Sequence, residues 1–297
     1  MEHDQIKAFT DIVKYGSISA AASNTYTSQS YLSHKLLTLE QELNATLITR
    51  GKGIRKIELT THGVEFLRLV NQYHATWNEM LQIGKSQDRM HLSVGAVHGI
   101  NAYTFRDIYR DYVMKHPEMR LNIYTYHSRD LYEKVASREN DLAYIYNAIN
   151  YTDIIVTPVF KEQFCLISKA DSPYYDGIMP NELSAKDEIY IRYNKEYEIW
   201  HDQFWSGNHY VVRISSTNSA VYLMDDKNRW AIANISTAKI LEKQYAIKIN
   251  TLGNQPPYLT CYLIEHKIPL ASRIVAIEIF KKQIYEYIRQ LEDIEII

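Results

Sequence analysis

In the first part of the chain, apolar residues recur at intervals of three and four positions, which is the spacing of amphipathic helices. Asp4 can cap a first helix over about 5–15, and Gly16 follows it, where helices often end in a left-handed residue. Ser17 suits the N-cap of a second, short helix that ends near Thr25. The chain therefore starts with two helices in quick succession.

A third helix is predicted to begin after Ser28, whose hydroxyl suits an N-cap, and to end at Asn44. Its apolar seam consists of Leu32, Leu36, Leu39 and Leu43. At about 100° of rotation per residue, the face opposite the seam holds Ser30, His34 and Gln41, with Gln29 and Ser33 on a flank. The exposed amino-terminal half of this helix is therefore small, polar and able to form hydrogen bonds.

The next segments predict a wing and a long helix. Leu47 and Ile48 form a short apolar run, 50–53 is a turn, and the following residues alternate up to Leu59, as in a two-stranded ribbon. Thr60 can cap the long helix, whose apolar seam has the seven-residue repeat of a coiled coil. The seam residues are Phe66, Val70, Tyr73, Trp77 and Met80. The seam favours a dimer, and the alternative is that it packs on other helices of the same chain.

From about residue 90, strand-like segments alternate with helical patterns, which is typical of an α/β domain. The predicted strands are 91–97, 121–123, 141–146, 154–160, 164–167, 189–193, 211–214, 230–233, 247–252 and 258–264, and a final helix covers about 273–291. The predicted fold class is thus α/β with an amino-terminal domain of helices plus a wing.

Composition narrows the possible partners. The chain has 297 residues, more than the usual single domain of about 100–200 residues, and its formal net charge is only −2. Contact with a nucleic acid therefore has to come from a local patch. The wing supplies one, because Arg50, Lys52, Arg55 and Lys56 place four positive charges within seven residues.

Several functional classes are disfavoured by what the sequence lacks. Charged residues interrupt the apolar positions at the amino terminus, and no stretch approaches the roughly 18 apolar residues of a membrane helix, so we expect a cytoplasmic protein without a membrane partner. Cys165 and Cys261 each lie in a strand-like run and are expected to be reduced core thiols. Glycine-rich phosphate loops and the common hydrolase, zinc and redox motifs are absent, which predicts no enzyme, no cofactor and no metal site.

The order of helices in the first block suggests a helix-turn-helix, whose second helix lies in the major groove of DNA. Gln29 can bond adenine through two hydrogen bonds, and Ser30 and Ser33 can bond a base or a phosphate. The candidate DNA-binding residues are Ser17, Thr27, Ser28, Gln29, Ser30, Ser33, His34, Lys35, Arg50, Lys52 and Arg55. Taken singly, these features are also typical of a surface helix and a solvated turn.

Their order resembles the amino-terminal domain of bacterial LysR-type transcriptional regulators. The matching runs are 16–22, 28–33, 39–44, 47–50 and 59–63, without gaps. The family usually has proline where this chain has Ser30 and arginine where it has His34. The second difference removes a permanent cation from the reading face and leaves open which bases are read.

The resemblance implies three parts, supported more weakly after residue 90 by the segments 92–96, 116–118 and 141–143. They are a winged helix-turn-helix DNA-binding domain over 1–60, a dimerising linker helix over 61–88, and an effector-binding domain over 89–297. The last would resemble a periplasmic binding protein, with subdomain I at about 89–161 and 267–297 and subdomain II at about 162–266. Trp230 replaces the glycine usual in the family, so we expect a partly filled second subdomain.

In such domains a ligand binds where the carboxyl ends of the strands meet. The resulting effector-binding candidates are Val97, His98, Gly99, Ile100, His127, Ser128, Tyr144, Tyr146 and Tyr193. His98 and His127 raise the alternative of a carboxylate effector or of a metal held by two imidazoles. The chain has 11 histidines, however, so chance placement of the pair is the favoured explanation.

The hypothesis from the sequence is a sequence-specific DNA-binding transcription regulator. It would form a homodimer, with pairing of dimers into a homotetramer, and would bind double-stranded operator DNA and a small-molecule effector. Effector binding would change DNA bending and the recruitment of RNA polymerase. Two alternatives remain, namely a small-molecule binding protein whose winged helix contacts another protein, and an α/β enzyme with a winged-helix appendage.

Overall fold

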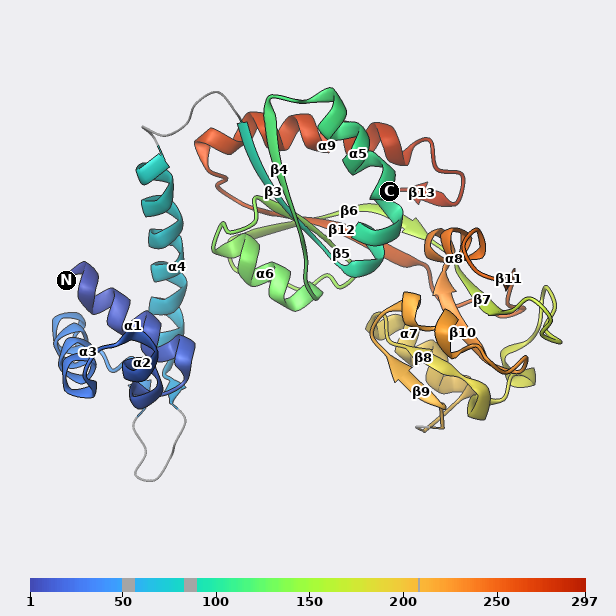
Figure 1. Ribbon diagram of the computed structural model, residues 1–297, viewed down its shortest axis with the longest axis horizontal. Helices are drawn as coiled ribbons and strands as arrows, with labels where there is room; N and C mark the ends of the chain where they lie inside the picture. Colours follow the sequence, from blue (N-terminus) through green and yellow to red (C-terminus); the bar gives the residue numbers. More distant parts are fainter. Residues whose placement is uncertain (50–56, 83–89, 208) are drawn as a thin grey trace. The chain divides into compact units, whose positions relative to one another are not determined.

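The computed structural model describes residues 1–49, 57–82, 90–207 and 209–297 (Figure 1). The chain divides into two compact units, Met1–Ser86 and Gln87–Ile297, and each is described by itself. Within the described ranges, no helix is long and apolar enough to cross a membrane.

The first unit has the predicted order of helices and wing strands. Its elements are α1 (His3–Tyr15), α2 (Ile18–Thr25), α3 (Gln29–Leu43), β1 (Ile48–Thr49), β2 (Glu58–Leu59) and α4 (Thr61–Gln82). The predicted helix ends are confirmed at Gly16, with φ of 74°, and at Asn44, with φ of 49°. The expected cap at Asp4 is wrong. Helix α1 starts earlier because Glu2 is its N-cap, and the Glu2 N–H donates to Gln5 Oε1 at 2.5 Å.

The core of the first unit forms where the leucine seam of α3 meets α1. Leu32, Leu36 and Leu39 are buried together with Phe9 and Ile12. Leu43 is instead 37% exposed, because it lies in the last turn of α3, beyond this contact. The predicted wing cations Arg50, Lys52, Arg55 and Lys56 lie outside the described residues.

The apolar seam of α4 is divided between the core and the surface. Val70 is buried, and the Phe66 ring lies edge-to-face on Phe9 with the centroids 5.2 Å apart, so this half packs within its own unit. The Trp77 ring lies 5.7 Å from the ring of His3, but Trp77 remains 39% exposed and Met80 49% exposed. The alternative that the seam packs on helices of the same chain is therefore right for its first half. It does not account for the exposed second half.

The second unit contains all the predicted strands. Its strands are β3 (Met90–Ala96), β4 (Met119–Thr125), β5 (Leu142–Ile145), β6 (Ile154–Glu162), β7 (Phe164–Lys169), β8 (Ile189–Ile191), β9 (Val212–Ile214), β10 (Trp230–Asn234), β11 (Ile247–Asn250), β12 (Leu259–His266) and β13 (Ile294–Ile296). Its α-helices are α5 (Arg106–Lys115), α6 (Ser128–Ala136), α7 (Lys195–Phe204), α8 (Ile235–Glu242) and α9 (Ile274–Ile288). The short edge strand β13 was not predicted.

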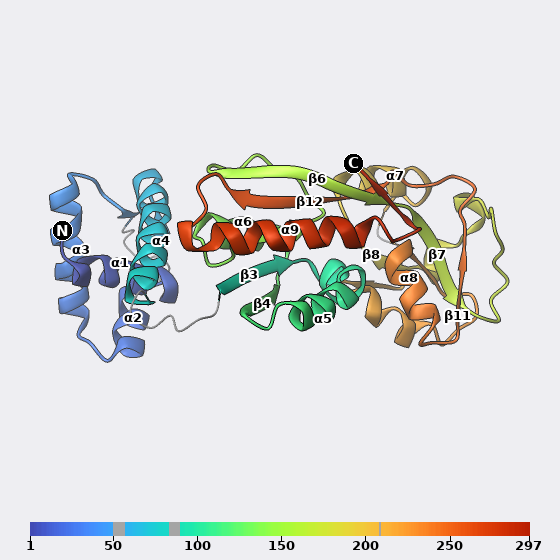
Figure 2. The same cartoon turned by 90° about the horizontal axis from the view of Figure 1, so that it is seen from above.

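Lobe I, as we name it, is built on a sheet that has the strand order β13-β6-β12-β5-β3-β4 within the described residues. Strand β3 runs parallel to β4 and β5, whereas β12 is antiparallel to β5 and β6. Successive side chains of β5 point to opposite faces of the sheet, and different helices cover the two faces. Leu142 and Tyr144 join the core under α5 and α9, and Ala143 and Ile145 join the core under α6; these helices lie on opposite sides of the sheet in Figure 1, and Figure 2 shows α5 and α9 from above.

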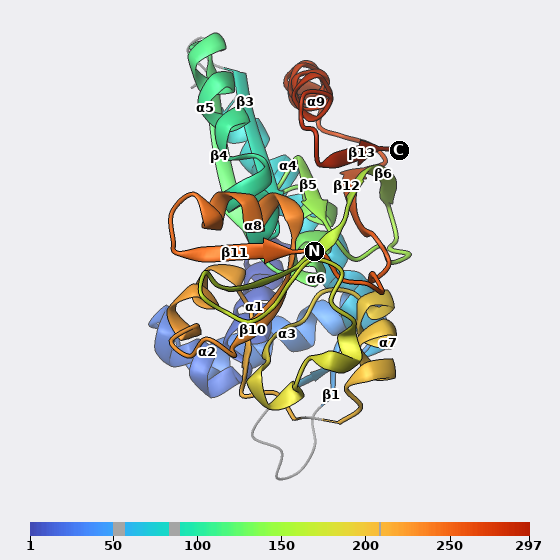
Figure 3. The same ribbon diagram turned by 90° about the vertical axis from the view of Figure 1, so that its right-hand side faces the viewer.

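Lobe II is built on the antiparallel sheet β10-β7-β11, beside which β8 and β9 form a parallel pair. Alternate residues of β10 serve two cores, with Trp230 and Ile232 on the side of α7 and Ala231 and Ala233 on the side of α8 (Figure 3). The side chain of Trp230 packs on Trp205, with the ring centroids 5.0 Å apart.

The chain passes between the two sheets after β6 and again before β12. The predicted subdomain boundary at residue 266 is wrong, because β12 pairs with β5 and β6 and so belongs to lobe I. The alternation of the 258–264 segment predicted a strand correctly, but it did not reveal which sheet the strand would join. The return crossing thus lies between β11 and β12.

The start of α4 requires a glycine. Thr60 caps this helix, since its Oγ1 accepts from the Gly63 N–H at 3.0 Å and donates to the Thr46 carbonyl at 2.6 Å. A Cβ added at Gly63 would lie 2.0 Å from the Leu47 carbonyl oxygen, which is a backbone atom that cannot rotate away.

We therefore expect Gly63→Ala to destabilise the first unit by about 1–3 kcal/mol through overpacking. Thermal unfolding followed by circular dichroism measures the loss. Val64→Ala is the matched control, because Val64 is the next residue and is 57% exposed. Equal melting temperatures for Gly63→Ala and the wild type would contradict this close approach.

Candidate nucleic-acid interface and effector cavity

The amino-terminal half of α3 presents polar groups to solvent. Ser28 is the N-cap, and its Oγ accepts from the Tyr31 N–H at 3.1 Å. Gln29, Ser30 and His34 are exposed, and Ser33 is half-buried. These positions are the ones from which a helix-turn-helix reaches base edges.

The polar groups around this helix start are joined by weak local hydrogen bonds. The Oγ atoms of Ser28 and Ser30 lie 3.0 Å apart, and Gln29 Nε2 donates to Ser19 Oγ at 3.3 Å. Thr27 is exposed, and its hydroxyl lies 2.9 Å from that of its neighbour Thr25. The Ser17 hydroxyl accepts from the Ala20 N–H at 3.0 Å, as expected of an N-cap. Most of these side chains can exchange their partners for a base or a phosphate.

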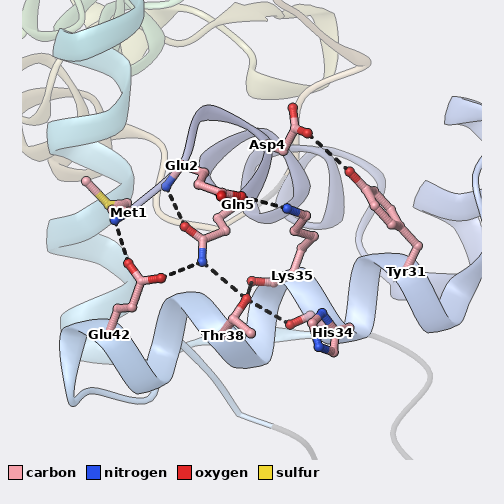
Figure 4. A network of polar contacts seen from close by, with 9 residues as sticks. All are labelled: Met1, Glu2, Asp4, Gln5, Tyr31, His34, Lys35, Thr38 and Glu42. Carbon is pink, nitrogen blue, oxygen red and sulfur yellow. Dashed lines mark hydrogen bonds and ion pairs between the residues drawn. The ribbon is translucent and has the colours of Figure 1, made fainter.

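A network of polar contacts fixes α3 against α1, and Figure 4 shows its side chains pointing toward one another. Gln5 is only 3% exposed, and its Nε2 donates to Thr38 Oγ1 at 3.2 Å and to Glu42 Oε1 at 2.8 Å. The hydrogen bond from Gln5 lowers the pKa of the Glu42 carboxyl below its usual value. The Met1 ammonium, which lies 2.6 Å from Glu42 Oε2, lowers it further. The tilt of the reading helix is thus set by α1.

Lys35 belongs to this network. Its Nζ lies 2.8 Å from Glu2 Oε2, and this bond raises the pKa of the lysine. Successive residues of a helix are rotated by about 100° about its axis. Lys35 therefore faces α1, while its neighbour His34 is exposed. We correct the prediction accordingly and leave Lys35 out of the reading face.

The second unit contains a cavity of about 800 Å³ between its lobes. In lobe I it lies where the carboxyl ends of β3, β4 and β5 meet, as expected for parallel strands. Lobe II contributes residues in and just after the carboxyl-terminal parts of β8 and β9, and the last residue of β10. The predicted residues that line it are Val97, His98, Gly99, His127, Ser128, Tyr146 and Tyr193.

Two predicted residues do not line the cavity. Ile100 is fully buried at the start of a short π-helical turn, and Tyr144 packs against Phe105 with the ring centroids 4.7 Å apart. Trp230 does not line the cavity either, so the substitution of the family's glycine leaves the cavity open. Its bulk lies in the core under α7.

Among the described residues, neither histidine at the cavity belongs to a cluster of three or more metal-ligating side chains. His98 Nδ1 lies 3.4 Å from Ser216 Oγ, a contact that joins lobe I to lobe II, and His127 is the N-cap residue of α6. In the described part of the chain, no group of three or more His, Cys, Asp or Glu side chains is placed to hold a metal ion.

The sequence did not reveal several polar residues of the cavity. They are Arg129, Arg192, Arg213, Ser216 and Asn234. Arg129 directly follows the candidate Ser128, and Arg192 directly precedes the candidate Tyr193, so position alone could have suggested both. Arg192 and Arg213 also line a second cavity of about 510 Å³, together with Tyr190, Tyr210 and the buried His201.

A buried carboxylate lies below the cavity, at the first crossing between the lobes. Glu162 is inaccessible to solvent, and its oxygens accept from Tyr146 Oη at 3.3 Å, from Asn234 Nδ2 at 3.0 Å and from the Ser236 N–H at 3.1 Å. Burial raises the pKa of Glu162, although the three bonds act in the opposite direction. Burial and the neighbouring Glu162 also raise the pKa of Tyr146.

The raised pKa of Glu162 determines whether this carboxyl group makes the folded protein more or less stable as the pH rises. The folded protein keeps the Glu162 proton to a higher pH than the unfolded chain, so the stabilisation is complete below the unfolded pKa of about 4.3. It declines as the pH rises through the folded value. We therefore expect the wild type to lose stability relative to Glu162→Gln as the pH rises from 4 toward neutrality.

Urea unfolding across this pH range measures the free energies of unfolding of the wild type and of Glu162→Gln. Glu133→Gln corrects for the general effect of losing one carboxylate, because Glu133 is exposed on α6. If the free energy of unfolding of the wild type minus that of Glu162→Gln stays constant or increases as the pH rises, the buried carboxylate is not costly.

Comparison with known proteins agrees with this architecture. A family model described as the bacterial regulatory helix-turn-helix protein of the lysR family matches residues 3–64, and the LysR substrate binding domain matches residues 85–221. The chain is 28% identical over 199 residues to the HTH-type transcriptional regulator SoxR of Arthrobacter sp. strain TE1826, covering 66% of each protein. It is 26% identical over 172 residues to the HTH-type transcriptional regulator YofA of Bacillus velezensis, covering 57% of this chain and 58% of that protein.

The chain thus matches about three fifths of the length of these curated relatives. Its fold is also that of a solved full-length OxyR variant from Pseudomonas aeruginosa, with a TM-score of 0.63 at 22% identity, covering 96% of this chain and 94% of that one. The two family models together span more than half of the chain, in the order of the two structural units. The protein belongs to the LysR family of bacterial helix-turn-helix regulators.

Proposed function

We propose that this protein is a sequence-specific transcription regulator that binds operator DNA through α3 and a small-molecule effector in the cavity between lobes I and II. The observation that carries the proposal is the exposed amino-terminal half of α3, with Gln29, Ser30 and His34 facing solvent in a winged helix-turn-helix. The relatives named HTH-type transcriptional regulators support it.

Base recognition would rest on uncharged donors and acceptors. Gln29 can form two hydrogen bonds with adenine in the major groove, and Ser30 and Ser33 can bond either a base or a phosphate. Positive charge would come from Arg50, Lys52 and Arg55 of the wing, which suit phosphate or minor-groove contact. The sequence alone supports this role for the wing residues.

Regulation would come from closure of the lobes around the effector. The two crossings of the chain, with Glu162 at the first, would form the hinge. A ligand that binds the closed form more tightly than the open form shifts the population toward closure. In an assembly of several chains, closure would change the spacing of the reading helices, and thereby DNA bending and the recruitment of RNA polymerase.

A homodimer would form through the exposed part of the α4 seam. Trp77 and Met80 are large apolar residues that remain 39% and 49% exposed, and the adjacent Leu81 is 52% exposed. A second copy of α4 would remove them from water. Pairing of dimers into a tetramer would involve the second unit.

The DNA-binding proposal predicts that the purified protein retards the DNA upstream of its own gene in a gel-shift assay at low salt. Gln29→Ala should weaken this binding by about tenfold or more, because a bidentate base contact contributes about 1–3 kcal/mol. Gln41→Ala is the matched control, as Gln41 is exposed in the carboxyl-terminal half of the same helix. No retardation by the wild type, or equal losses in the two variants, would contradict the proposal.

The dimer proposal predicts that Met80→Glu weakens self-association, since it places a charge in the apolar seam. Sedimentation analysis over a range of protein concentrations measures the dissociation constant, and we expect it to rise by about tenfold or more. Val64→Glu introduces the same charge at an exposed position of α4 outside the seam and should leave association unchanged. A wild type that sediments as a monomer would refute the dimer.

A further inference from the structure

The charges that line the cavity between the lobes indicate the chemistry of its ligand. Three guanidinium groups line the cavity, from Arg129, Arg192 and Arg213, and the carboxylate among the described lining residues is that of Asp130. The described lining therefore carries an excess of positive charge, although the chain as a whole has a net charge of −2.

Within the described part of the chain, two of the three guanidinium groups have no carboxylate close enough for an ion pair. Arg192 forms an ion pair with Glu198. Among the described residues, by contrast, no carboxylate lies within 4.0 Å of Arg129 or Arg213. The guanidinium of Arg213 lies over the Tyr190 ring, 6.0 Å from its centroid, a contact that leaves its N–H donors available.

The amino terminus of α6 adds partial positive charge to the same cavity. Residues 127–130 line the cavity, and α6 begins at Ser128. The N-cap residue His127 makes no side-chain capping bond, so no side chain caps the first N–H groups of this nine-residue helix at that position. These groups carry partial positive charge and suit an anion. Asp130, in the first turn of this helix, offsets part of that charge.

Hydrogen-bond donors surround these charges on both sides of the cavity. Thr125 and Ser128 contribute hydroxyls from lobe I, and Ser215, Ser216 and Thr217 contribute hydroxyls from lobe II. The lining thus provides donors for several oxygen atoms, together with guanidinium groups that match carboxylates and phosphates through paired hydrogen bonds.

We propose that the effector is a small polyanion, with at least two negative charges on carboxylate or phosphate groups, that binds between Arg129 of lobe I and Arg213 of lobe II. The two guanidinium groups repel each other as the lobes approach, and an anion between them turns this repulsion into attraction on both walls. This proposal rests on the proposed function, because it names the ligand class of the same cavity.

The test measures thermal stabilisation of the full-length protein by succinate, citrate, inorganic phosphate and pyrophosphate at constant ionic strength. Succinamide is the uncharged counterpart of succinate. We expect at least one anion to raise the Tm in a saturable way, and the uncharged counterpart to have no effect. The carboxylates and the phosphates form separate arms, which distinguish the two sources of negative charge.

The arginine variants assign the binding to this cavity. Arg129→Gln and Arg213→Gln should each weaken the apparent Kd by about tenfold or more, since each loses a charge-assisted contact. Arg289→Gln, an exposed arginine after α9 that does not line the cavity, should bind like the wild type. Fluorescence of Trp200, Trp205 and Trp230 in lobe II gives a second reading of the same binding.

Two results would overturn the polyanion proposal. One is the absence of saturable stabilisation by any of the four anions. The other is stabilisation that Arg129→Gln and Arg213→Gln leave unchanged. DNA retardation is measured on the same preparations without any anion. If the wild type retards DNA but binds none of the anions, the polyanion proposal is refuted and the proposed function stands. If the wild type does not retard DNA, the proposed function itself is contradicted.

Discussion

The effector cavity depends on the buried carboxylate of Glu162. This side chain lies where the chain leaves lobe I for lobe II, and it accepts hydrogen bonds from Tyr146 of lobe I and from Asn234 and the backbone of Ser236 in lobe II. Tyr146 and Asn234 also line the cavity, so the bonds of Glu162 connect residues of the cavity wall to the first crossing between the lobes. A polar group this deeply buried is tolerable only because its oxygens have partners. The three bonds therefore join lobe I to lobe II beneath the proposed site of closure.

Features determined by neighbouring residues could be predicted from the sequence. Ser17, Ser28 and Thr60 cap their helices as expected, because a hydroxyl three residues before a free backbone N–H acts locally. Gly16 and Asn44 end their helices in the left-handed conformation for the same reason. The alternation of apolar residues gave the strands of the second unit, since a half-buried strand has to alternate.

Features determined by distant partners could not be predicted in this way. The alternation that identified β12 is the same whether the strand joins lobe I or lobe II, so the boundary at 266 was misplaced. Tyr144 and Tyr146 point to the same side of their strand, but β5 ends at Ile145, and of the two tyrosines only Tyr146 reaches the cavity. Glu162 is an ordinary glutamate in the sequence, and its burial follows from two strands and a helix start that converge on it.

The arginines of the cavity explain why closure would depend on a ligand. Two like charges about 4 Å apart repel by roughly 1 kcal/mol in water and by about four times as much at the effective dielectric constant of a protein surface. Closure expels water, so it weakens the screening of the repulsion between Arg129 and Arg213, and an anion between them offsets that repulsion. The same loss of water strengthens the attraction of each arginine to a bound anion. The empty cavity is therefore expected to favour the open form and the polyanion-bound cavity the closed form, and the difference between the two is the free energy available to reposition the reading helices.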